Sequence, residues 1–83
     1  MNWTVVWSEA ARRDLKRCDR DICARALAAV EQLANTGRGD VKKLQGTANQ
    51  YRLRVGSWRV FLTYDKDGRQ LIVLRVLERK NAY

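Results

Sequence analysis

The arginines of residues 51–64 are the side chains in this sequence best suited to chemistry. Apolar and basic residues alternate on both sides of Gly56-Ser57, which favours a β-hairpin with a two-residue type II′ turn. This register places Arg54 directly opposite Arg59, with Arg52 on the same face. Like charges paired across strands are destabilising, whereas guanidinium groups bind phosphate oxygens well. The segment therefore predicts a face that binds a polyanion.

Charge and length narrow the class of partner. The 83 residues are enough for one domain, residues 1–83. A net charge of +8 points to nucleic acid, or to an acidic protein that neutralises the surface. Membrane binding is disfavoured, because the sequence has no long apolar segment and no basic helix with bulky aromatics. The N-terminal residues also lack the pattern of a secretory signal, so we expect a cytoplasmic protein.

The cysteines give little reason to expect a metal or cofactor. Cys18 and Cys23 are the only two, and their spacing does not place them on one helix face. A disulfide would need a turn between them, and we favour two reduced thiols that pack as small hydrophobes. Without histidine, the two thiols are too few for a zinc site. We expect no metal and no cofactor.

The hydrophobic pattern predicts the elements of the first half. Residues Asn2–Trp7 alternate as a strand, and Ser8 is a suitable N-cap for a helix that runs to about Cys18. A second helix spans about Asp21–Ala34, with Gly37 as its C-terminal stop, and the two helices are expected to be antiparallel. The first helix carries four basic residues outside its apolar stripe, namely Arg12, Arg13, Lys16 and Arg17.

The second half predicts further strands. Residues 36–49 form a polar loop around a short segment that contains Lys42 and Lys43. If Lys66–Gly68 is a three-residue loop, Asp65 pairs with Arg69. The last strand then places Ile72, Leu74 and Val76 on the helix-covered face, and Leu71, Val73, Arg75 and Arg79 on the arginine face. A four-residue loop would reverse that strand.

The predicted fold class is α+β. One strand and two antiparallel helices come first, and a three-stranded antiparallel meander follows. The helices pack on one face of the sheet and leave the other face open.

This order of elements, together with three motifs, resembles the RelE/ParE superfamily of toxins from bacterial type II toxin–antitoxin systems. The motifs are Lys42-Lys-Leu-Gln-Gly46, Tyr51–Val60 and the ending Val76–Tyr83. In the RelE branch, the resemblance implies a RelE-like fold and a ribosome-dependent endoribonuclease that cuts messenger RNA. It also implies an acidic antitoxin partner that silences the toxin. The catalytic positions that it implies are Arg52, Arg54, Arg59, Arg79 and Tyr83.

Two departures from the family pattern bear on catalysis. The RelE branch has lysines where Arg52 and Arg54 stand, and many relatives carry histidine or lysine at the position of Glu78. Metal-free RNA scission needs a base for the 2′-hydroxyl, cations for the phosphorane and an acid for the leaving oxygen. Arginine supplies cations, but its pKa above about 12 makes it a poor base. Strand alternation turns Glu78, a candidate base, away from Arg79.

Tyr83 could stack on a nucleotide base or give up its phenolic proton among guanidinium groups. We therefore expect catalysis to depend mostly on positioning and charge stabilisation, with the ribosome presenting the RNA.

A second group of residues is assigned to RNA or ribosome binding. Its members are Arg12, Arg13, Lys16, Arg17, Lys42, Lys43, Phe61 and Arg75. Clustered cations steer a protein toward RNA, and an aromatic among arginines suits base stacking. The simpler alternative is a solvated basic surface, and for Phe61 a place beneath the bound antitoxin. Phe61, Leu71 and Val73 fit capture by an acidic, partly disordered segment.

Two other functions stay open. One is a ParE-type toxin without enzymatic activity, which inhibits DNA gyrase by binding it. The other is an RNA-binding module that has no cleavage activity.

Overall fold

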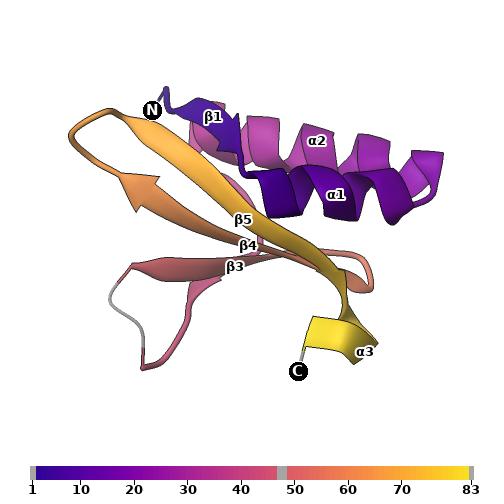
Figure 1. Cartoon of the computed structure of the whole chain (residues 1–83). Helices are drawn as coiled ribbons and strands as arrows, with labels where there is room; N and C mark the ends of the chain where they lie inside the picture. Colours follow the sequence, from indigo (N-terminus) through magenta and orange to yellow (C-terminus); the bar gives the residue numbers. More distant parts are fainter. Residues whose placement is uncertain (1, 47–48, 83) are drawn as a thin grey trace.

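Two helices cover one face of a five-stranded sheet, and a short third helix lies on the opposite side (Figure 1). The computed structural model describes residues 2–46 and 49–82. In chain order the elements are β1 (Thr4–Trp7), α1 (Glu9–Arg17), α2 (Arg20–Thr36), β2 (Val41–Lys43), β3 (Gln50–Val55), β4 (Trp58–Asp65), β5 (Gln70–Glu78) and α3 (Arg79–Ala82). The predicted α+β class is confirmed. Strand β2 and helix α3 are additions to the predicted elements.

The strand order is β1-β5-β4-β3-β2. Strand β1 runs parallel to β5, and the other pairs are antiparallel. Strand β2 adds an edge strand to β3 within the segment that we expected to be a loop. The core lies between the sheet and the helices, and β5 contributes Leu71, Val73 and Val76 to it. Within the described residues, no helix is long and apolar enough to cross a membrane.

Helix α1 begins, and helix α2 ends, at the capping residue that the sequence predicts. The Ser8 hydroxyl accepts a hydrogen bond from the Ala11 amide and donates one to the Leu74 carbonyl, so it caps α1 and ties it to β5. Helix α2 ends at Gly37, whose φ of 76° is the left-handed conformation that glycine adopts at low cost. Both cysteines are free, and the Cys18 thiol donates to the Asp14 carbonyl.

The hairpin between β3 and β4 has the predicted register. Val55 pairs with Trp58, and Arg54 pairs with Arg59. Gly56 has a φ of 59°, and Ser57 does not have a positive φ, as the type II′ turn requires. A two-residue turn leaves no freedom to shift the pairing, so the predicted arginine face forms on these two strands.

Of the two loops considered between β4 and β5, the three-residue one is wrong and the four-residue alternative is found. Asp65 pairs with Gln70 instead of Arg69, so the loop has four residues, and Arg69 adopts the positive φ (51°). This shift puts Leu71 and Val73 in the core. Burying two such side chains gains about 1.5–3 kcal/mol each, which exceeds the cost of about 1–2 kcal/mol for a left-handed arginine.

A β-bulge in β5 then restores the predicted faces of the strand's second half. Phe61 pairs with Arg75 while the next residue of β4, Leu62, pairs with Val73, so Leu74 is the extra residue. Ile72, opposite Thr63, is therefore on the face opposite the one predicted. Beyond the bulge, Arg75 shares the arginine face and Val76 is buried, as predicted.

Candidate functional site

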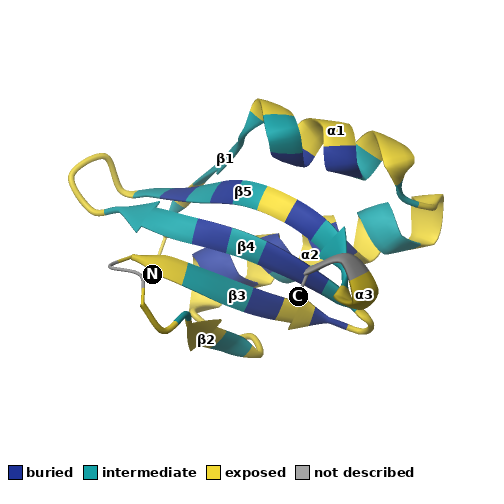
Figure 2. Cartoon of the chain, turned by 60° about the horizontal axis from the view of Figure 1, so that its bottom comes forward, coloured by how far each residue is buried: buried dark blue, intermediate teal, exposed yellow. Residues whose placement is uncertain are grey.

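The site is built on the sheet face that α1 and α2 leave uncovered, which we call the open face (Figure 2). Two rows of paired residues cross it. The first row is Lys42, Arg52, Phe61 and Arg75, one from each of strands β2 to β5. The second row is Arg54, Arg59 and Leu77. The strand pairing thus brings together six of the predicted site residues, including the aromatic one.

Arg54 is held only loosely on this face. Its Nη1 lies 3.8 Å from Oδ2 of Asp40, and both side chains are more than half exposed. Ion pairs of this kind contribute about 0–1 kcal/mol. A phosphate group could therefore replace Asp40 as the partner of Arg54 at little cost. The neighbouring Arg52 is half-buried in the middle of β3.

Arg59 is held tightly. Only 4% of the residue is exposed, and its Nη1 donates to the Gly56 carbonyl at 3.1 Å and to the Trp58 carbonyl at 2.9 Å. The Nε atom is buried and has no hydrogen-bond partner among the described residues. Such an unpaired buried donor costs about 1–3 kcal/mol. The structure therefore fixes a cation beside the hairpin turn and leaves one of its donors unsatisfied.

Helix α3 lies on the open face near this turn (Figure 2). The Arg79 amide donates to the Ser57 carbonyl at 2.8 Å, and α3 contacts β4 and β5. Arg79 starts this helix and does not continue β5 as predicted, because the strand ends at Glu78. Alternation therefore stops there, and Glu78 lines an open hollow with Ser57, Arg79 and Lys80. Tyr83 lies outside the described residues.

Arg75 has a structural partner that the sequence analysis missed. Its Nε and Nη2 donate to the two carboxylate oxygens of Asp14 at 2.8 and 3.1 Å, and the Val76 amide donates to Asp14 at 2.8 Å. Burial alone would raise the pKa of Asp14. The hydrogen bonds from Arg75 and Val76 and the charges of Arg75 and Arg17 outweigh burial, and the pKa is lowered. Asp14 thus stays ionised and joins α1 to β5.

A signal for Asp14 is present in the sequence. It lies at helical spacing with Ala11, Leu15 and Cys18, on the apolar stripe of a helix whose other charged residues lie outside it. A carboxylate on such a stripe needs a cationic or amide partner.

The basic residues of α1 are all exposed, but only some approach the sheet. Arg13 and Arg17 line a shallow hollow with Asp14 and Arg75. Arg12 and Lys16 are exposed on the same helix and do not line it. Lys43 pairs with Tyr51, one residue out of step with the Lys42–Arg52 pair, so it belongs to the other side of the sheet. The structure thus places Lys43 on the opposite side of the sheet from Lys42, with which it was grouped for RNA or ribosome binding.

The site therefore offers a fixed guanidinium (Arg59), a loosely held one (Arg54), and a row of three cationic side chains with one aromatic side chain, Phe61, among them. Such an arrangement can hold a phosphodiester and stack a base. The described residues include no group of three His, Cys, Asp or Glu side chains arranged to hold a metal ion.

Comparison with known proteins agrees with this architecture. Residues 5–83 match the family described as the ParE toxin of the type II toxin-antitoxin system, parDE. The chain is 32% identical over 84 residues to Toxin RelE3 of Methanocaldococcus jannaschii, which covers 95% of this chain and 93% of the relative.

Two solved structures are similar in sequence and in fold. The RelB-RelE antitoxin-toxin complex from Methanococcus jannaschii has a TM-score of 0.78 and 30% identity, and the match covers 94% of each chain. The toxin-antitoxin complex RelBE2 from Mycobacterium tuberculosis has a TM-score of 0.80 and 27% identity, and covers 95% of this chain and 100% of that one. With its fold, its basic open face and these relatives, the chain belongs to the RelE/ParE family of toxins from type II toxin–antitoxin systems.

Proposed function

We propose that this toxin is a ribosome-dependent endoribonuclease that cuts messenger RNA and so blocks translation. The observation that carries the proposal is the pair of cross-strand rows on the open face, where Arg54 lies opposite Arg59 and Arg52 lies opposite Phe61. Two arginines directly opposite each other weaken the hairpin. A bound phosphodiester would turn this repulsion into attraction, because each guanidinium can donate to its oxygens.

Arg59 is the residue best placed to stabilise charge that develops on the scissile phosphate. Its guanidinium is anchored by two backbone carbonyls, so it needs no reorganisation when the RNA binds. Arg54 would close on the same phosphate from β3 after releasing Asp40.

Proton transfer is the weaker part of the chemistry. The chain has no histidine, and arginine is a poor base. Glu78 and Arg79 share one hollow, so a carboxylate and a guanidinium lie close together at the edge of the site. We propose that positioning on the ribosome supplies most of the acceleration, with Glu78 as a candidate base and Tyr83 as a further candidate.

The partners that we propose are the ribosome with its messenger RNA, and a cognate acidic antitoxin, in the cytoplasm. The similar chain from M. jannaschii is described in a RelB-RelE antitoxin-toxin complex, and the net charge of +8 suits an acidic partner. Arg75 plays a smaller part in RNA binding than predicted, because Asp14 neutralises it.

Translating a reporter message with the purified protein and mapping its 5′ ends tests the proposal. We expect cuts in phase with codons that appear only when ribosomes are present. Arg54→Ala should reduce cutting, whereas Arg38→Ala, an exposed control with the same loss of charge, should not. Intact message at growth-arresting concentrations would contradict the proposal.

The second candidate is a ParE-type inhibitor of DNA gyrase. One observation favours it: backbone carbonyls hold Arg59 and Asp14 holds Arg75, so two of the cations on the open face are already engaged. Inhibition of gyrase supercoiling by the purified protein, with intact message in the translation assay, would support this candidate.

A further inference from the structure

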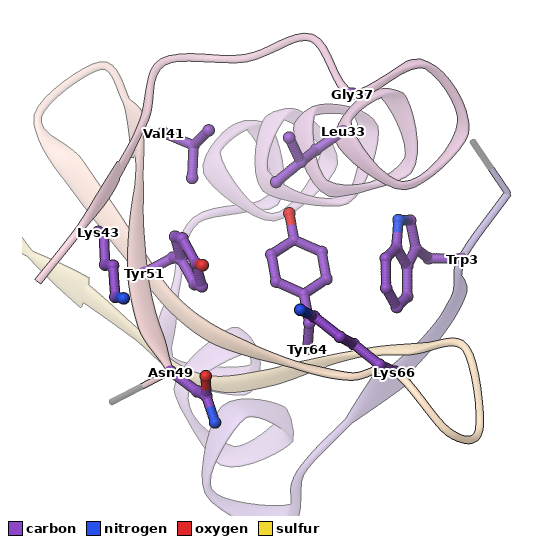
Figure 3. Close-up of a pocket in the computed structure, with 9 residues that line it drawn as sticks. All are labelled: Trp3, Leu33, Gly37, Val41, Lys43, Asn49, Tyr51, Tyr64 and Lys66. Carbon is purple, nitrogen blue, oxygen red and sulfur yellow. The ribbon is translucent and has the colours of Figure 1, made fainter. Parts of the chain in front are cut away.

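A pocket of about 390 Å³ lies on the other side of the sheet from the open face, and the proposed function does not use it. It opens between the C-terminal end of α2, the edge strand β2 and the end of β4 (Figure 3). Its lining consists of Trp3, Leu33, Gly37, Val41, Lys43, Asn49, Tyr51, Tyr64 and Lys66.

Three aromatic rings form one wall of the pocket. Trp3 and Tyr64 have ring centroids 4.8 Å apart at 56°, and Tyr51 meets Tyr64 edge-on at 5.2 Å and 79°. Because the rings meet at steep angles, they present no pair of parallel faces between which a flat nucleobase could slide. The wall suits a compact, bulky apolar group that contacts several ring edges.

The cationic side chains of the pocket lie on one side of it, and the Tyr64 hydroxyl points toward Leu33 (Figure 3). In Figure 3, Lys43, Asn49 and Lys66 lie on the side away from the α2 helix, while Leu33 and Trp3 lie on the opposite side. Both lysines are exposed, and none of the described residues that line the pocket is acidic. The rim therefore attracts an anion, and the interior accepts an apolar group.

The charged residues next to the pocket indicate which lysine that anion would contact. Asp65 and Asp67 line an adjoining shallow hollow that shares Asn49, Tyr64 and Lys66 with this pocket. Lys43 does not line that hollow, so its charge is available to an occupant of the pocket. The favoured occupant thus carries its carboxylate near Lys43 and its apolar group toward Leu33.

We propose that this pocket is the docking site for a bulky apolar side chain of an acidic partner protein, with flanking carboxylates of that partner placed at Lys43 and Lys66. The inference rests on the proposed function, in which the acidic partner is the cognate antitoxin. It specifies where one apolar side chain of that partner, its anchor, binds the toxin. The anchor is on the opposite side of the sheet from Arg54 and Arg59, so the partner would hold the toxin without occupying the RNA site there.

Charge reversal at the rim tests the proposal. The probe is the purified cognate antitoxin, and its affinity is measured by calorimetry. Lys43→Glu and Lys66→Glu should each weaken binding roughly tenfold, or ~1.4 kcal/mol. Arg20→Glu, an exposed change of equal charge at the start of α2, should change the dissociation constant by less than about twofold. Wild-type affinity for both lysine variants would overturn the proposal.

Occupation of the pocket is read separately from the Trp3 indole N–H signal in ¹H–¹⁵N spectra, identified with a Trp3→Phe variant. The signal should shift when the antitoxin binds and stay unchanged when adenosine monophosphate is added. A shift with the nucleotide alone would assign the pocket to nucleic acid and overturn the proposal.

A growth-arrest assay distinguishes failure of the docking site from failure of the proposed function. Lys66→Glu should still arrest growth and should resist neutralisation by the antitoxin. If the wild-type chain did not cut message but its binding depended on Lys43, the proposed function would fail while the docking site stood.

Discussion

Replacing Asp14 with asparagine should destabilise the protein more than any other single change of charge on α1. Asp14 is only 6% exposed, yet it accepts three hydrogen bonds, two from Arg75 and one from the Val76 amide. The substitution keeps the size of the side chain and removes its charge. It therefore isolates the electrostatic bond between α1 and β5.

The magnitude follows from the exposure of the two partners. Hydrogen bonds to a charged group contribute about 1.5–3 kcal/mol, and breaking a buried ion pair costs about 3–5 kcal/mol. The Arg75 side chain is 46% exposed, so it regains water when the carboxylate is lost. The amide oxygen of asparagine can still accept from Val76. We therefore expect the free energy of unfolding to fall by about 2 kcal/mol, at the low end of these ranges.

The assay is urea unfolding at neutral pH, with the slope checked for two-state behaviour. The matched control is Glu9→Gln. Glu9 forms an exposed ion pair with Arg13 on the same helix and should contribute less than about 0.5 kcal/mol. An Asp14→Asn variant as stable as the control would refute the reasoning.

The same variant predicts a pH dependence. The pKa of Asp14 is lower in the folded chain than its ordinary value, so the folded state favours the carboxylate. The stabilisation is complete above the unfolded pKa of about 3.9 and is lost as the pH falls through the folded value. The stability gap between wild type and Asp14→Asn should therefore narrow as the pH falls below about 4. A gap that stays constant down to the acid transition would contradict the assignment.

Three further predictions concern the turn, the pocket and the open face. Gly56→Ala should destabilise by about 1–2 kcal/mol, because Gly56 has a positive φ, whereas Gly68→Ala, where φ is not positive, should change the urea midpoint much less. Burial raises the pKa of Tyr64, so Tyr64→Phe should remove a phenol that ionises above its ordinary pH range in an absorbance titration; an unchanged curve would contradict this assignment. Lys42→Ala should lower the salt dependence of RNA binding by about 0.7–0.9 in log–log slope, and an unchanged slope would remove Lys42 from the phosphate-binding row.

The sequence predicted best where local chemistry leaves one solution. A glycine at the first position of a two-residue turn sets the register of every pair in the hairpin, so the Arg54–Arg59 pair could be predicted directly. The caps at Ser8 and Gly37 act in the same way, because each supplies a hydrogen bond or a conformation that few other residues can.

The wrong predictions concern segments whose local conformation is determined by tertiary packing. The β4–β5 loop takes a conformation with a left-handed Arg69 because that register buries Leu71 and Val73. From the loop sequence alone, a glycine and not Arg69 would be expected in the left-handed conformation. The bulge at Leu74 cannot be predicted from periodicity, since it depends on α1 packing against the end of β5.

The sequence predicted which residues form the candidate site, but it predicted less well how those residues are held. Strand alternation identified the arginines but could not show that Arg59 is buried against carbonyls or that Arg75 is paired. Both facts depend on contacts between residues distant in the sequence. The pocket around Tyr64 was missed for the same reason, because its walls come from Trp3, just before β1, and from α2, β2, β3 and β4.

The parallel pairing of β1 with β5 has a consequence for biosynthesis. Val5 finds its partner, Leu71, only after almost the whole domain has been made. Closing so long a loop is entropically unfavourable, and contacts of this kind form late. While the chain is still emerging from the ribosome, β1 and α1 therefore lack β5, the strand on which they pack. The native sheet is completed only once that strand is free, which delays the appearance of an active toxin at the ribosome that makes it.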